Sequence, residues 1–326
     1  MKRVIIAVLG LAAASLSSGG ASAQEISIKL AHSLSTTEPA NLAAEYFAKN
    51  VGERTKGKVK ITVFPNEQLG SGKDVNEMMR QGAPVMNITD PGYLSDFVPD
   101  VGVLNGPYLL TKPEDFNKIL ASDWYKEIDQ KLQKAGLRVI SFNNFFGARH
   151  IIADKPIRTP ADMQGITIRV PPNTMWIETF KAMGARPATV NWSEVYSALQ
   201  QNVVQAAEAP LGSLYGSKLF ETRKTISMTS HFIAWVTFTM SNDYFKRLPK
   251  DVQTVLLEEG KKSGDYMTKL TMDMEKDYIE KLKAQGVTFV TDVDKAAFQK
   301  ATAGVYNAFP KWTPGLHEKI EAILKQ

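Results

Sequence analysis

The sequence predicts a two-lobed α/β protein in which each lobe is a mostly parallel sheet flanked by helices, and one long helix spans both lobes. Three observations predict this fold. Strand-type alternation and helical spacing of apolar residues follow one another repeatedly, as in parallel sheets covered by helices. The chain of 326 residues exceeds the usual size of a single hydrophobic core. Residues 249–285 keep a helical pattern that only Gly260 and Gly264 interrupt, which is long enough to cross two lobes.

The first 23 residues are typical of a cleavable signal peptide. Lys2 and Arg3 precede an apolar run over residues 4–14, and the segment ends in the small residues 21–23. This run is too short to span a bilayer whose hydrocarbon core is about 30 Å thick. We therefore expect cleavage before Gln24 and export of the mature chain. Removing two of the 39 basic residues leaves 37 against 34 acidic residues, a net charge of +3.

The first lobe begins with a strand, a helix and a second strand, which together form the β-α-β unit of a parallel sheet. A further helix and a buried strand continue the alternation, and a Pro-Gly turn follows. In chain order the expected strands are 26–30, 59–64 and 85–89, the expected helices are 41–54 and 73–81, and the turn is at Pro91-Gly92.

A long strand leads into the second lobe, which begins near residue 146, and the rest of the chain repeats the mixture of strands and helices. The expected strands are 137–146, 149–153, 166–170, 206–208 and 232–240, and the expected helices are 174–183 and 193–201. We assign residues 24–145 and 235–275 to the first lobe, and residues 146–234 and 276–326 to the second. The long helix is expected to act as a brace between the two lobes.

Several function classes lack support in the composition and the motifs. The absence of cysteine excludes thiol nucleophiles, disulfides and cysteine-bound metals. The net charge is small and no block of like charges occurs, so nucleic acid is not an expected partner. The glycine loop at residues 70–73 lacks the first glycine and the Ser or Thr of a phosphate loop. No histidine has a partner at metal-ligand spacing, so we predict neither a metal nor a cofactor. The four histidines are His32, His150, His231 and His317.

The informative residue is Arg169, which lies near the end of an expected strand in the segment 160–171. In open α/β sheets, ligands bind beyond the carboxyl ends of the strands. A guanidinium group is planar and permanently charged, and its paired donors match the two oxygens of a carboxylate. The segment therefore favours recognition of an acid in a cleft. An ordinary surface arginine or an ion-paired one is the alternative.

This segment belongs to a series of motifs that resembles a known family. The other members are Gly147-Ala148-Arg149, the strand start at 57–61, Gln68-Leu69-Gly70 and the helical stretch 193–204. In this order they resemble the solute-binding proteins of tripartite ATP-independent periplasmic (TRAP) transporters, of the dicarboxylate-binding DctP type. The resemblance covers nearly all of the mature chain. It implies a periplasmic binding protein fold, a periplasmic location, a small carboxylate ligand between the lobes, and the membrane subunits of a TRAP transporter as partners.

The resemblance also implies roles for individual residues. Arg169 makes the main salt bridge to the ligand carboxylate, and Arg149 is a second cationic contact. Family members often carry an Asp-Gly-x-Glu-Asn-Pro stretch, in which Glu208 is kept here and Ala209 replaces the asparagine. The ligands of other family members therefore do not identify the ligand of this chain. Tyr215 is a further candidate ligand contact. The remaining expected ligand contacts are His32, Asp90, Trp192, Phe146, Asn173 and the retained Glu208.

Three other functions remain open at this point. The receptor of an ATP-driven importer also has two hinged lobes, but it lacks a helix that crosses both. A secreted hydrolase or lyase acting on an organic acid could use Asp90, Glu208 and His32 as acid and base groups. A sensory protein could dock on a receptor kinase when its ligand is bound.

Overall fold

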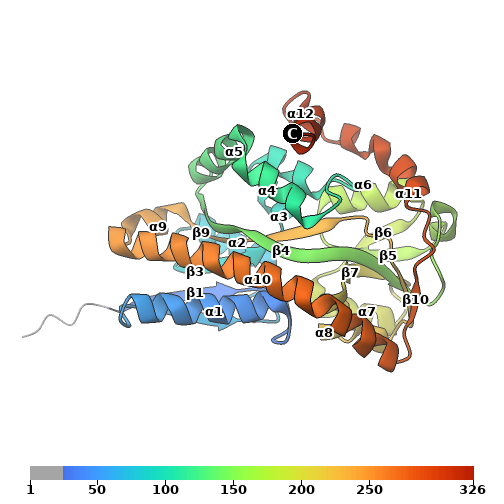
Figure 1. Cartoon of the computed structure of the whole chain (residues 1–326), viewed down its shortest axis with the longest axis horizontal. Helices are drawn as coiled ribbons and strands as arrows, with labels where there is room; N and C mark the ends of the chain where they lie inside the picture. The colour runs from blue at the N-terminus through green and yellow to red at the C-terminus, as the bar shows by residue number, and fades with distance from the viewer. Residues whose placement is uncertain (1–24) are drawn as a thin grey trace, which may run out of the picture.

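The computed structural model describes residues 25–326, which form a two-lobed α/β fold (Figure 1). The predicted signal peptide lies outside this range. Strand β4 and helix α10 run the length of the molecule, with the first lobe at one end and the second at the other. Within residues 25–326 no helix is both long enough and apolar enough to cross a membrane.

The first lobe starts with the predicted β-α-β-α-β order, and each boundary falls within two residues of its expected place. β1 pairs in parallel with β2 and with β3, so the carboxyl ends of these strands lie at the same edge. Polar residues that follow β1 and β3 therefore reach the same region. The elements are β1 (Ile26–Ala31), α1 (Pro39–Arg54), β2 (Val59–Phe64), α2 (Gly72–Arg80) and β3 (Val85–Thr89).

A helical segment that the sequence analysis did not predict completes this lobe. It comprises α3 (Pro91–Leu94), a 3₁₀ helix (Pro99–Asn105), α4 (Pro113–Ala121) and α5 (Asp123–Lys134). Phe116 of α4 stacks on Trp235, with ring centroids 4.2 Å apart. The neighbouring Val236 belongs to a second apolar cluster that includes Phe47 of α1. Side chains alternate between the faces of a strand, so helices cover both faces of this sheet.

One strand replaces the two that we predicted over residues 137–153. β4 (Leu137–Ala153) is continuous and pairs antiparallel with β9 (Ile233–Ser241) across most of its length. Gly147, which lies between the two predicted strands, has a φ of 125° and lies at a register shift in this pairing. A residue with a side chain rarely adopts this conformation, and the bulge lets β4 bend without ending. β4 therefore connects the two lobes.

The main sheet is mixed, which corrects our expectation of mostly parallel sheets. Its strand order is β10-β8-β4-β9-β3-β1-β2, with β7 also pairing β4, and every pairing of β4 is antiparallel. β5 and β6 form a separate parallel pair. The second-lobe elements are β5 (Thr167–Val170), α6 (Thr174–Ala182), β6 (Arg186–Thr189), α7 (Val195–Gln200), β7 (Ala207–Pro210), α8 (Leu211–Gly216), β8 (Thr225–Ser227) and β10 (Thr288–Val290).

The long helix α10 (Lys250–Ala284) confirms the predicted element that crosses both lobes (Figure 1). Its two glycines permit a close approach to β4. A Cβ atom on Gly260 would lie 2.7 Å from the carbonyl oxygen of Ile140, and one on Gly264 would lie 2.3 Å from the amide oxygen of Asn143. Any larger residue would push α10 away from the strand, so these glycines hold the brace against the sheet.

Three shorter helices complete the chain, namely α9 (Asn242–Arg247), α11 (Lys295–Thr302) and α12 (Leu316–Leu324). α11 packs beside α6 in the second lobe, whereas α12 packs against α4 of the first. The end of the segment 276–326 therefore returns to the first lobe, although we had placed it in the second. The remaining lobe boundaries stay a prediction, because β4, β9 and α10 continue through them.

Candidate functional site

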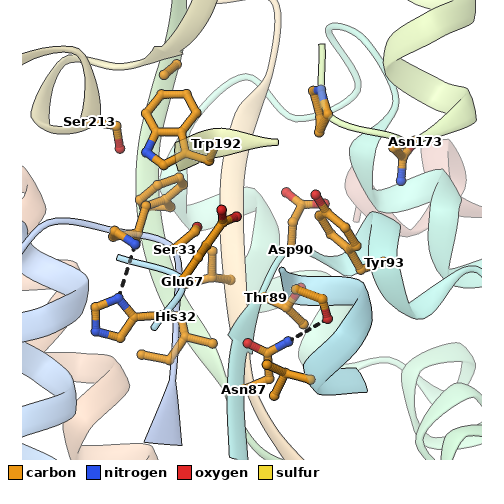
Figure 2. A pocket seen from close by; sticks show the side chains of 18 of the residues that line it. His32, Ser33, Glu67, Asn87, Thr89, Asp90, Tyr93, Asn173, Trp192 and Ser213 are labelled. Carbon is orange, nitrogen blue, oxygen red and sulfur yellow. Dashed lines mark hydrogen bonds between the residues drawn. The ribbon is translucent and has the colours of Figure 1, made fainter. Parts of the chain in front are cut away.

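A pocket lies where residues of the two lobes face each other, and it has about 850 Å³ of space when its open mouth is included. Figure 2 shows side chains that point into it from loops, strands and helices of both lobes. Seven of the eight predicted site residues line the pocket, namely His32, Asp90, Phe146, Arg149, Arg169, Asn173 and Trp192.

The eighth predicted residue, Glu208, lies behind Arg149 instead of in the pocket wall. Its carboxylate accepts hydrogen bonds from Nε and Nη2 of Arg149 at 2.6 and 2.7 Å. His231 at 3.0 Å and the indole nitrogen of Trp176 at 2.9 Å complete the contacts of this carboxylate. Burial alone would raise the pKa of Glu208, but Arg149 and His231 outweigh burial and hold the pKa well below its usual range. The carboxylate of Glu208 thus neutralises Arg149 and fixes the plane of the Arg149 guanidinium group.

Arg169 has no such partner. Its Nε donates to the backbone oxygen of Val190 at 2.9 Å, and its guanidinium lies 5.1 Å from the ring centre of Trp192. The residue is only 3% exposed, yet no carboxylate among residues 25–326 forms an ion pair with it. Burial lowers the pKa of Arg169 to about 10, which still leaves it charged at neutral pH. Its two terminal nitrogens make no hydrogen bond within the described chain, so they are available to a ligand.

Asp90 follows β3 and projects from the wall of the first lobe (Figure 2). It caps α3 by accepting a hydrogen bond from the backbone N–H of Gly92 at 2.7 Å. Asn105 donates to its other oxygen at 3.2 Å. Burial raises the pKa of Asp90 to about 7, despite the opposing effects of the Gly92 N–H and Arg149.

His32 lines the same wall, but both of its ring nitrogens are already engaged. Nδ1 accepts from the backbone N–H of Leu34 at 3.2 Å, so the ring proton is on Nε2, which lies 3.2 Å from the amide oxygen of Asn41. Burial lowers the pKa of His32 to about 4, so the ring is neutral at physiological pH. His32 therefore contributes an uncharged, rigid surface.

Asn173 and Trp192 present polar groups from the second lobe. The amide oxygen of Asn173 caps α6 by accepting from the N–H of Met175, which leaves its amide nitrogen as a free donor beside Gly92. The indole nitrogen of Trp192 has no hydrogen-bond partner among the described residues. Ala209 also lines the pocket, so the substitution of the family asparagine changes the pocket wall.

Tyr215, which we considered as a further contact, does not line the pocket. Its ring instead stacks on Phe220, with a centroid distance of 5.6 Å.

Sequence reasoning missed much of the first-lobe wall. Asn87 and Thr89 belong to β3, whose end we had identified only through Asp90. Their position beside the carboxyl end of a parallel strand was the signal that could have found them. The missed polar residues of this wall are Ser33, Glu67, Asn87, Thr89 and Tyr93, and Figure 2 labels all of them.

Two glutamates accept hydrogen bonds across the lobes beside the pocket. Glu67, in the loop after β2, accepts from the hydroxyl and the backbone N–H of Ser193, which precedes α7. Glu38, at the start of α1, accepts from the hydroxyl of Ser213 in α8 at 2.5 Å. Glu67 and Ser213 also line the pocket. Two residues that line the pocket therefore also help to hold the two lobes together.

This arrangement is suited to binding rather than to acid–base chemistry. Glu208 is fully buried behind Arg149, and both nitrogens of His32 are engaged, so two of the three groups that we considered for catalysis are not free. Within residues 25–326 no group of three metal-binding side chains occurs. The fold and the pocket define a two-lobed binding protein with an uncompensated arginine in its cleft.

Comparison with known proteins agrees with this class. Residues 30–311 match the model of the bacterial extracellular solute-binding proteins, family 7 (DctP). The chain belongs to this family, whose solved members include the periplasmic solute-binding proteins of TRAP transporters. The resemblance inferred from the motifs is thereby confirmed, and the receptor of an ATP-driven importer is excluded.

Three relatives show how widely the family's ligands differ. A TRAP periplasmic solute-binding protein from Ochrobacterium anthropi, solved with L-fuconate, is 38% identical, with a TM-score of 0.89 over 92% of this chain and 99% of that one. One from Sulfurospirillum deleyianum, solved with succinate, is 30% identical, with a TM-score of 0.85 over 92% and 99%. The 2,3-diketo-L-gulonate-binding periplasmic protein of Escherichia coli is 29% identical over 97% of this chain and 95% of its own.

Proposed function

We propose that this protein is the periplasmic receptor of a TRAP-type secondary transporter, and that it binds a small organic acid through a salt bridge between Arg169 and the ligand carboxylate. One observation carries the proposal, namely that Arg169 is 3% exposed and has no carboxylate partner in residues 25–326. A buried charge is costly unless it is paired. A ligand carboxylate would supply the missing partner.

Neighbouring groups support the same position for the ligand carboxylate. Among residues 25–326, Nη1 of Arg149 has no hydrogen-bond partner, because Glu208 engages only Nε and Nη2. The amide nitrogen of Asn173 is a further donor on this side of the pocket. Arg149 thus acts as a fixed donor, and Arg169 supplies the net positive charge. Trp192 stacks on Arg169 and keeps its plane in place.

The relatives support the transport role. The named relatives are periplasmic binding proteins, and two of them were solved with organic acids. The N-terminal sequence fits export to the periplasm. Closure of the lobes around the acid would present a loaded receptor to the membrane subunits of the transporter. The proposed activity is reversible binding without turnover.

The test is calorimetric titration of the purified protein with organic acids, after dialysis to remove any acid that co-purifies. Arg169→Ala is expected to weaken binding of the cognate acid by about 2–5 kcal/mol, because it removes one partner of a desolvated charge pair. The matched control is Arg158→Ala, since Arg158 is exposed on the surface and pairs with Asp292. Equal affinity of Arg169→Ala and the parent would disprove the salt bridge.

A further inference from the structure

The loop that follows β2 has a strained backbone and carries Glu67 at a fixed position. Asn66 and Glu67 are consecutive residues with φ of 53° and 57°, a left-handed conformation that asparagine tolerates better than glutamate. The N–H of Asn66 donates to the oxygen of Leu34 at 3.1 Å, and the next N–H donates to the oxygen of His32 at 3.0 Å. Strain of this kind persists where the surrounding structure fixes it, and it clusters at ligand clamps and switch regions.

The side chain of Glu67 reaches a turn of the opposite lobe. Its carboxylate accepts hydrogen bonds from the hydroxyl of Ser193 and from the backbone N–H of the same residue, the latter at 3.3 Å. Among residues 25–326 these are the hydrogen bonds of this side chain, and it forms no ion pair. Ser193 lies in a 3₁₀ turn (Trp192–Glu194) outside the pocket wall, whereas Trp192 lines the pocket. In Figure 2 the side chain of Glu67 extends toward the wall that carries Trp192.

The segment that ends at this turn also holds Arg169. The backbone oxygen of Val190 accepts from Nε of Arg169 at 2.9 Å, and the ring of Trp192 lies 5.1 Å from the guanidinium group. Within residues 25–326 the Arg169 side chain makes no further hydrogen bond. Residues 190–192 therefore set the plane of the guanidinium group, and Glu67 of the other lobe grips the residue that follows them.

We propose that Glu67 is a positioning residue, which acts across the lobes through Ser193 to hold Arg169 in the orientation that receives the ligand carboxylate. This inference rests on the proposed function, since it starts from a carboxylate at Arg169. A guanidinium group pairs with both oxygens of a carboxylate when its plane is correctly set. The bonds between Glu67 and Ser193 join the two lobes, so separation of the lobes would break them and loosen the hold on Arg169 at the moment of release.

The main test variant is Ser193→Ala, because Ser193 lies outside the pocket wall. The probe is the acid that the parent binds most tightly among lactate, pyruvate, succinate, malate, gluconate and glucuronate, measured by calorimetry. Ser193→Ala is expected to weaken binding roughly fivefold, the effect of one lost hydrogen bond. Ser193→Thr keeps the hydroxyl and should bind like the parent. Ser197→Ala is the matched control, since Ser197 is an exposed serine of α7 outside the pocket.

A double-mutant cycle tests whether the effect depends on Glu67. Glu67→Ala removes the acceptor, so adding Ser193→Ala to it should change affinity by less than about 1.5-fold. The cycle is needed because Glu67 itself lines the pocket. The urea midpoint of ligand-free Ser193→Ala should match that of the parent, which separates positioning from a general loss of stability. An undiminished effect of Ser193→Ala in the absence of Glu67 would overturn the inference.

A second cycle tests whether the effect reaches Arg169. Arg169→Lys keeps the charge but has neither the Nε–H that binds Val190 nor a planar face for Trp192. In this background Ser193→Ala should therefore weaken binding by less than about twofold. If the full effect persists, the bonds of Glu67 hold the lobes together without orienting Arg169, and the positioning role is wrong.

The outcomes separate this inference from the proposed function. If Arg169→Ala weakens binding of the probe acid but Ser193→Ala does not, the salt bridge stands and the role assigned to Glu67 is wrong. If the bound acid is indifferent to Arg169, the proposed function itself fails, and the inference fails with it.

Discussion

Arg149 and Arg169 line the same pocket, and both are buried beside a tryptophan ring, yet among residues 25–326 only Arg149 has a carboxylate partner. Arg149 forms a bidentate ion pair with Glu208, which His231 and Trp176 also contact. Arg169 has a single backbone acceptor, Val190, and an aromatic face beside it. Two arginines in one site can therefore have separate roles. One gives the site its geometry, and the other gives it an unbalanced charge for a ligand.

The largest expected effect follows from breaking the Arg149 network. Glu208→Gln should lower the free energy of unfolding by about 3–5 kcal/mol, because it leaves Arg149 buried without a counter-charge. Urea unfolding of the ligand-free protein measures this effect. Glu258→Gln, which removes a half-exposed partner of Arg54, is the control and should cost less than about 1 kcal/mol.

The same urea unfolding experiment on an Arg169 variant tests whether Arg169, unlike Arg149, has no structural partner. Arg169→Met should change the free energy of unfolding by less than about 1 kcal/mol, because losing the bond to Val190 is offset by removing an unpaired buried charge. A loss as large as that of Glu208→Gln would mean that Arg169 has a structural partner after all.

A conservative change at Arg169 has the next largest effect. Arg169→Lys keeps the charge but loses the planar pair of donors, so affinity for the cognate acid should fall by about 1.5–3 kcal/mol while stability is nearly unchanged. Calorimetry and thermal unfolding on the same preparation separate the two quantities. Parent-like affinity would indicate that charge alone holds the ligand and that the fork geometry has no role.

The difference between the arginines also marks the limit of what the sequence could predict. A strand pattern placed Arg169 at a sheet edge, and the family motifs brought Arg149 to the same cleft. Which arginine is neutralised could not be read from the chain, because Glu208 is 59 residues from Arg149 and meets it only through the pairing of β7 with β4. The helical brace was predicted because its pattern is local and long.

Features that depend on contacts between residues far apart in the chain were harder to predict from the sequence. The sequence predicted two strands on either side of Gly147, yet β4 continues through this glycine because it stays paired with β9 there. The acceptors on the first-lobe wall were missed because each is an ordinary polar residue until β1, β2 and β3 bring their ends together. Local periodicity thus fixed most first-lobe elements, whereas the charge balance of the pocket required the tertiary structure.

A further expected effect concerns the pH dependence of stability at Asp90, which lies across the pocket from the two arginines. Burial raises the pKa of Asp90 to about 7, whereas the unfolded chain releases this proton near 3.8. Between these values the folded protein holds more protons than the unfolded chain, so stability is fully present below about pH 4 and is lost as the pH rises through 7.

Asp90→Asn should remove this part of the pH dependence. Asn105 can turn its amide to accept from the new side chain, since its Oδ1 has no partner among residues 25–326 in the parent. Between pH 5 and pH 8 the ligand-free parent should lose roughly 1–2 kcal/mol more stability than the variant, a figure reduced because the carboxyl group faces a partly open pocket. Thermal unfolding across this range measures the difference, with Asp96→Asn as control, since Asp96 is exposed and pairs with Lys73 outside the pocket. Parallel curves for parent and variant would mean that Asp90 is already ionised at pH 5, and the first-lobe wall would then repel anions more strongly than its burial suggests.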